Sequence, residues 1–172
     1  MSALRHRLMY QESEKRLTSA KMLRAAGDAS DSAYLLELLA FELLLKLSFE
    51  KAVGSIAPGH HRYAEIFGSL SQVIKDEVLR LAGERVGPSE LSSNLGTVLK
   101  DLGSNFVKLR YPFERYSQMT EEQYEKVGAD WVANGAALAD AEFRYYPEEL
   151  LGLTTALQIL VRAPVMPDSP PP

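Results

Sequence analysis

The chain has 172 residues, 46% of them hydrophobic, which suits a single domain that buries its own core. It contains no cysteine, so disulfides, thiolate metal sites and cysteine nucleophiles are excluded. Its net charge of −4 argues against a broad electrostatic grip on nucleic-acid backbones, but leaves room for a local basic groove.

The sequence also favours a protein that stays out of the membrane. The longest apolar run is interrupted by Glu37, Glu42 and Lys46, so no stretch approaches the roughly 20 apolar residues of a membrane span. The first residues lack the apolar segment of a secretory signal. Together with the absence of cysteine, these features lead us to expect a cytoplasmic protein without a membrane partner.

The first part of the chain predicts two consecutive helices. From Leu4 to Ala26, leucine and alanine recur every three or four residues, which indicates an amphipathic helix that ends at Gly27. The segment from Asp31 to Val53 is the most apolar of the chain, and its leucines and phenylalanines nearly encircle a helix. We therefore expect it to be the central helix of the core.

Three further helices are predicted in the middle of the chain. A helical stripe of apolar residues begins at Tyr63 and extends across a kink to Leu81. Ser89 is expected to cap the next helix, which ends before Pro112 because the residue before a proline is pushed out of the helical region. A helix start at Thr120, followed by two glutamates, predicts a helix that reaches about Phe143.

The end of the chain is expected to form a short helix and a tail. Pro147 is tolerated in a first helical turn, and leucines follow it. Residues 163–172 are rich in proline and have little to bury, which predicts a disordered tail. The predicted fold is all-α: an antiparallel up-and-down helical bundle of about five helices over residues 4–143, a short C-terminal helix over residues 147–162, and the tail.

Three short segments carry the candidate chemistry. Phe41–Lys46 places Glu42 and Lys46 one helical turn apart, Gly59–Phe67 contains His61, and Leu109–Glu114 contains Arg110 followed by Tyr111 and Pro112. In this order and spacing, over roughly Leu8 to Phe143, the segments resemble the HEPN family of helical bundles. The resemblance implies a homodimer that binds a nucleotide or RNA. It further implies a nucleotidyltransferase-like partner protein, and in toxin members of the family RNA cleavage.

The sequence departs from the RNA-cutting members of that family. Those members carry a histidine a few residues after the late arginine, whereas the residues after Arg110 include none. Metal-independent RNA cleavage needs groups that take and return protons near neutral pH, which histidine does best. The ribonuclease motif is therefore incomplete, and Arg110 alone could only hold phosphate or stabilise charge.

Each candidate site residue also has a structural explanation. Glu42 and Lys46 can form an ion pair that keeps an apolar helix soluble, and Arg110 can stabilise the carbonyl end of its helix. The functional alternative is an anion clamp at Arg110, with an aromatic face from Tyr111. The candidate ligand-binding residues are Arg110, Tyr111, Glu114, Lys46, Glu42 and His61.

No metal or cofactor site is predicted. His60 and His61 are adjacent, so they point to different sides of a helix, and no third ligand lies at a suitable spacing. Trp131 invites an interface interpretation, but core packing is the commoner fate of a lone tryptophan on an amphipathic helix.

The residues and the resemblance together predict a binding module rather than an enzyme. We expect a non-catalytic homodimer that binds a nucleotide, an RNA phosphate or a partner protein. One alternative is a metal-independent ribonuclease or toxin of a HEPN–nucleotidyltransferase pair, using Arg110 with Glu114 or His61 as acid or base. The other is a structural scaffold, since a fold does not by itself imply a function.

Overall fold

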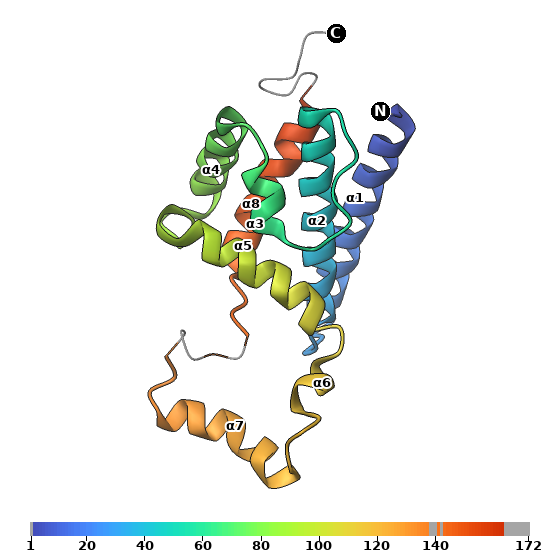
Figure 1. The fold of residues 1–172 in the computed structure, drawn as a ribbon. Coiled ribbons are helices and arrows are strands. Elements are labelled where there is room, and N and C mark those ends of the chain that lie inside the picture. The colour runs from blue at the N-terminus through green and yellow to red at the C-terminus, as the bar shows by residue number, and fades with distance from the viewer. Residues whose placement is uncertain (1, 138–140, 142, 164–172) are drawn as a thin grey trace.

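The structure is a computed structural model that describes residues 2–137, 141 and 143–163. Over these residues the chain forms eight helices and no strand, which confirms the predicted all-α bundle (Figure 1). The helices are α1 (Ala3–Ala25), α2 (Ser32–Val53), α3 (Tyr63–Gly68), α4 (Gln72–Val86), α5 (Leu91–Lys108), α6 (Pro112–Tyr116), α7 (Glu121–Ala133) and α8 (Pro147–Arg162).

Helix α2 is the central helix that the sequence predicted. It packs against α1, α3, α5 and α8, and Leu38, Leu44 and Leu45 have no exposed surface. Because leucines point outward on several sides of α2, each neighbouring helix can bury apolar area against it. The helix ends at Gly54, whose left-handed backbone (φ 75°) suits a residue without a Cβ atom.

The predicted kink after Tyr63 is a full break between two helices. Helix α3 ends at Gly68, and α4 begins after Ser71, whose Oγ accepts a hydrogen bond from the Ile74 N–H. Helix α5 ends before Pro112 as expected. Its N-cap residue is Glu90 rather than the predicted Ser89, whose Oγ only accepts a long 3.4 Å contact from the Leu91 N–H.

Helix α8 belongs to the core of the bundle. It packs between α2 and α4, and its Leu153 and Leu157 have no exposed surface. Gly152 permits this packing, because a Cβ atom there would lie 3.1 Å from Val86 Cγ1 and 3.2 Å from the Ala82 carbonyl oxygen. The described bundle therefore extends to Arg162, beyond the predicted boundary at residue 143.

Residues 111–137, here called the outer arm, lie apart from the bundle in Figure 1 and carry α6 and α7. Neither helix contains a buried residue. The predicted start at Thr120 is confirmed by a capping box with Gln123, but α7 ends at Ala133 and not near Phe143. The reason is that Gly135 and Ala136 adopt positive φ angles of 91° and 51°, which a right-handed helix cannot accommodate.

Two further sequence predictions concern the C-terminal tail and membrane-spanning helices. The predicted tail, residues 163–172, lies outside the described residues except for Ala163. In the part of the chain that is described, no helix combines the length and apolar character needed to cross a membrane.

Candidate functional site

A buried carboxylate lies at the centre of the candidate site. Glu42, in the middle of α2, has only 6% of its surface exposed. Its Oε1 accepts a hydrogen bond from Lys46 Nζ at 2.8 Å, so the predicted pair one helical turn apart is present. Because a buried carboxylate needs donors for its remaining lone pairs, this one contact is not enough to stabilise it.

The remaining donors come from the segment that opens α3. His61 Nδ1 lies 2.7 Å from Glu42 Oε2, and the Tyr63 hydroxyl donates to the same oxygen at 3.0 Å. Burial and the nearby Glu42 charge raise the pKa of Tyr63, so its hydroxyl keeps its proton and serves as a donor. We call Glu42, Lys46, His61 and Tyr63 the Glu42 network.

A glycine on α5 lets this segment approach closely. A Cβ atom at Gly103 would lie 2.4 Å from the His61 carbonyl oxygen, closer than real Cβ contacts allow. One turn further along α5, the ring of Phe106 packs against the His61 imidazole with 4.9 Å between centroids. Gly103 and Phe106 therefore fix where His61 lies relative to the end of α5.

Arg110 lies at that end of α5 and shares the same aromatic ring. Its guanidinium carbon is 5.0 Å from the centroid of Phe106, the range of a cation–π contact. The side chain is exposed, and no carboxylate or helix carbonyl among the described residues hydrogen-bonds to it. No hydrogen bond therefore supports the helix-capping explanation of Arg110, and the charge of the Arg110 guanidinium faces solvent.

The other two predicted residues lie outside this cluster. Tyr111 is 55% exposed and packs edge-on against Phe113, with 6.2 Å between centroids. Glu114 is exposed on the short helix α6, and no described contact joins it to the Glu42 network. Three of the six candidates therefore meet directly, Arg110 adjoins them through Phe106, and Tyr111 and Glu114 do not take part.

A cavity of about 540 Å³ lies on the α5 side of His61. Its polar wall includes His61, Arg62, Lys100 and Ser104, whereas Glu42, Lys46 and Arg110 are not among its lining residues. With Nδ1 held by Glu42, the Nε2 atom of His61 has no hydrogen-bond partner in the described chain. Within the same residues, no group of three His, Asp or Glu side chains is arranged to hold a metal ion.

Sequence reasoning missed three residues that build the site. Tyr63 follows His61 by two positions, and its place in the apolar stripe of a helix gives no sign of a polar role. Phe106 belongs to the amphipathic stripe of α5 and carries no signal that separates it from ordinary core residues. Gly103 did carry a signal, since a glycine inside a helical pattern often marks close approach of another backbone.

The fold and the site together define an all-α bundle with a polar network centred on a buried carboxylate, Glu42. No family model matches the chain, and comparison with curated proteins and with solved structures likewise finds no match. The likeness to the HEPN family accordingly depends on the residue pattern alone.

Proposed function

We propose that this chain is a HEPN-like binding module for a phosphate-bearing ligand, either a nucleotide or an RNA. The observation that carries the proposal is the position of Arg110, an exposed and unpaired cation packed on Phe106 beside the Glu42 network. An arginine held against an aromatic ring keeps its planar donors directed outward, which suits bidentate binding of phosphate.

The charges around the site support an anion at Arg110 rather than at Lys46. Lys46 is only 15% exposed and its charge is balanced by Glu42, so it has little left for a ligand. Lys100 on α5 is exposed and has no carboxylate partner in the described chain, and it lines the cavity next to His61. A ligand with more than one phosphate could contact both Arg110 and the Lys100 side of the cavity.

The Glu42 network contributes rigidity to this surface. Two of its donors, His61 and Tyr63, tie the start of α3 to α2, and Phe106 then links His61 to the end of α5. Because Glu42 and Tyr63 are buried, the hydrogen bond between them loses little strength to water. The binding surface is thereby organised before a ligand arrives, which lowers the cost of ordering it.

The direct test compares two exposed arginines. Arg110→Ala should weaken binding of ATP or of a short single-stranded RNA by about tenfold or more, because a charge-assisted contact is lost. Arg80→Ala is the control, since Arg80 lies on α4 and is already paired with Glu77 and Glu84. Fluorescence anisotropy gives the affinities. Equal affinities for wild type and Arg110→Ala, or no binding by wild type, would refute the proposal.

A second pair of variants tests the role of the His61 segment. Gly103→Ala must displace the His61 backbone, whereas a Cβ atom at Gly96 on the same helix and cavity meets nothing within 4 Å. We expect Gly103→Ala to weaken ligand binding and Gly96→Ala to leave it nearly unchanged. Circular dichroism must show that both variants keep their helices. If both variants bind the ligand as tightly as wild type, the position of His61 does not matter for binding.

One observation favours RNA cleavage as a second candidate function. The Glu42 carboxylate orients His61 through Nδ1, which leaves Nε2 to take the proton of a ribose 2′-hydroxyl, while Arg110 could stabilise the charged phosphate. Glu114, which the sequence offered beside His61 as an acid or base, has no described contact with this group. Cleavage of RNA by wild type in excess EDTA, lost in both His61→Ala and Arg110→Ala, would establish this candidate. Binding without cleavage would eliminate it.

The HEPN resemblance also leads us to propose a homodimer and a nucleotidyltransferase-like partner. The outer arm has exposed apolar side chains, among them Phe113 and Val132, which offer apolar surface for binding a second copy or a partner. Light scattering at micromolar protein concentration measures the mass in solution. A monomer mass would remove the dimer from the proposal without affecting the test of Arg110.

A further inference from the structure

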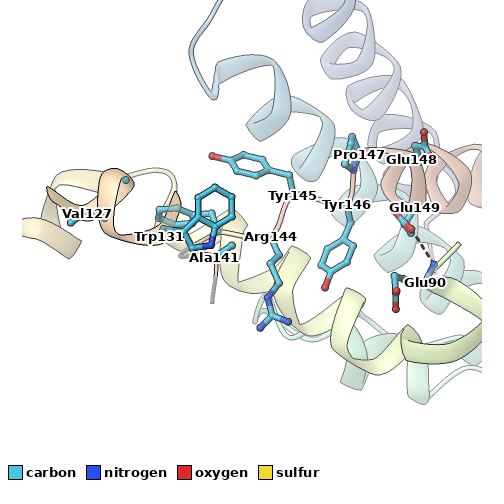
Figure 2. Close-up of a pocket in the computed structure, with 12 residues that line it drawn as sticks. Glu90, Val127, Trp131, Ala141, Arg144, Tyr145, Tyr146, Pro147, Glu148 and Glu149 are labelled. Carbon is cyan, nitrogen blue, oxygen red and sulfur yellow. Dashed lines mark hydrogen bonds between the residues drawn. The ribbon is translucent and has the colours of Figure 1, made fainter. Parts of the chain in front are cut away.

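A second cavity, of about 770 Å³, lies between α7 and the start of α8 (Figure 2). Its walls are unusually rich in aromatic side chains, with Trp131 from the outer arm and Phe143, Tyr145 and Tyr146 from the segment that leads into α8. Tyr146 has a positive φ of 47°, which is costly for a residue with a Cβ atom. Among the described residues, none lines both this cavity and the one beside His61.

The opposite end of the cavity carries carboxylates. Glu148 and Glu149 belong to the first turn of α8, and Glu90 precedes α5. Figure 2 draws as a dashed line the hydrogen bond that Glu149 Oε1 accepts from the Glu90 N–H at 3.2 Å, while the carboxylates of Glu148 and Glu90 point away from Glu149. This end of the cavity is therefore strongly negative.

Glu149 is an unusual member of this group. It is only 8% exposed, yet no cationic side chain of the described chain pairs with it, and its second oxygen accepts no hydrogen bond there. The N-terminal ends of α8 and α5 supply some positive potential. They must do so against the like charges of Glu90 and Glu148, so the buried carboxylate lacks the counter-ion that such groups normally have.

Arg144, the one basic residue among the described lining residues, does not supply that counter-ion. Arg144 Nε lies 3.4 Å from Asp101 Oδ2 on α5, and Figure 2 shows its side chain directed toward α5. The Tyr146 hydroxyl donates to the same Asp101 oxygen at 3.3 Å. Since Asp101 balances Arg144, the three glutamates leave the cavity with a net negative charge.

From these features we propose that this cavity binds an organic cation with an apolar body, an amine or a guanidine. The positive group lies beside Glu149, where it supplies the missing counter-ion, and the charge of Glu148 one residue away adds to the attraction. The apolar body lies along Tyr146, Phe143 and Trp131, whose ring faces attract cations and bury apolar surface. The ligand chemistry is opposite in charge to the phosphate proposed at Arg110, so the two proposals stand or fall separately.

Trp131 is the only tryptophan of the chain, so its fluorescence reports on this cavity. Phenethylamine should change the emission in a saturable way, and phenylethanol and phenylacetate, which lack the positive charge, should bind about tenfold more weakly. A short tryptophan-free peptide with one arginine between leucines forms a second arm. Tighter binding of the peptide than of the amine identifies a basic segment of a partner protein as the source, and the reverse identifies a free small molecule.

Single substitutions locate the positive group. Glu149→Gln keeps an oxygen that can accept from the Glu90 N–H, and Glu148→Gln changes an exposed residue. Each should weaken amine binding about tenfold, whereas Glu121→Gln, an exposed glutamate of α7 outside the lining, should not. Equal binding of phenylethanol and phenethylamine, unchanged affinity in Glu148→Gln and Glu149→Gln, or no response to amine or peptide would overturn the proposal.

Discussion

Helices α2 and α7 are stabilised in different ways. More than half of the 22 residues of α2 are buried, whereas none of the 13 residues of α7 is. A helix of that length is marginal in water unless packing supports it, so α7 depends on its capping box at Thr120 and on local side-chain pairs. The comparison separates the bundle, where tertiary packing sets stability, from the outer arm, where local interactions do.

The largest expected effect comes from the core of α2. Leu44→Ala removes a side chain with no exposed surface and should lower the free energy of unfolding by about 2–5 kcal/mol. Val132→Ala, on α7, changes a residue that is 64% exposed and should alter it by less than about 0.5 kcal/mol. Urea denaturation followed by circular dichroism measures both. Similar losses in the two variants would show that the outer arm is packed as tightly as the core.

Charged pairs should show the same contrast. The Glu50 side chain has no exposed surface and is held by Arg5 at 2.8 Å and by the Ala57 N–H at 3.1 Å. Glu50→Gln should therefore cost about 1.5–3 kcal/mol of unfolding free energy. The control is Glu122→Gln, which removes an exposed pair with Lys126 and should cost about 0.5 kcal/mol or less.

The pH dependence of stability checks the same carboxylate. Burial alone would raise the pKa of Glu50, but hydrogen bonds from Arg5 and the Ala57 N–H outweigh it and hold the pKa below its usual 4.5. A lowered pKa in the folded state stabilises the protein above pH 4.5, and this contribution is lost as the pH falls through the folded value. Wild type should lose stability more steeply than Glu50→Gln over that range; parallel curves would contradict the assignment.

Two glycines test packing within the bundle. Gly152→Ala places a Cβ atom 3.1 Å from Val86 Cγ1 and should cost about 1–3 kcal/mol, because α8 cannot move away from α4 without opening the core. Gly83→Ala, on α4, meets nothing within 4 Å and should stabilise the protein by about 0.5–1 kcal/mol through helix propensity. Thermal melts of the two variants should therefore shift in opposite directions. A loss in both would mean that Gly83 is also packed.

The sequence predicted the bundle well because its signals are local. Periodic leucines placed α2, and the Thr120 capping box placed the start of α7. The same signals failed where the chain's surroundings decide the outcome. Trp131 was expected in the core by its helical spacing but is 37% exposed, since α7 extends from the bundle. The predicted length of α7 is too long because a pattern of polar and apolar residues does not record the positive φ angles of Gly135 and Ala136.

The candidate site was predictable only in part for the same reason. Glu42 and Lys46 are one turn apart on one helix, so their pairing follows from spacing alone. His61 joins them through a loop whose path depends on the close approach to Gly103, which no local pattern specifies. Nothing in the sequence marks Glu149, because a glutamate in a first helical turn is ordinary until the surrounding fold buries it.

The smallest expected effect on stability is the most direct test of the comparison between the bundle and the outer arm, because it should be confined to the outer arm. Thr120 Oγ1 accepts the Gln123 N–H at 3.2 Å, and the Gln123 side chain accepts the Thr120 N–H at 2.9 Å. Thr120→Ala removes one half of this box and should destabilise α7 by about 1 kcal/mol. Amide hydrogen exchange should then speed up several-fold over Glu121–Ala133, while α2 and the global urea midpoint stay unchanged, since α7 shares no buried residue with the core.

Ser71→Ala is the matched control: it removes the cap of α4, a helix with three buried residues, and should lower the global midpoint instead. If Thr120→Ala also lowers the global midpoint, α7 unfolds together with the bundle, and the division between packing and local stabilisation does not hold.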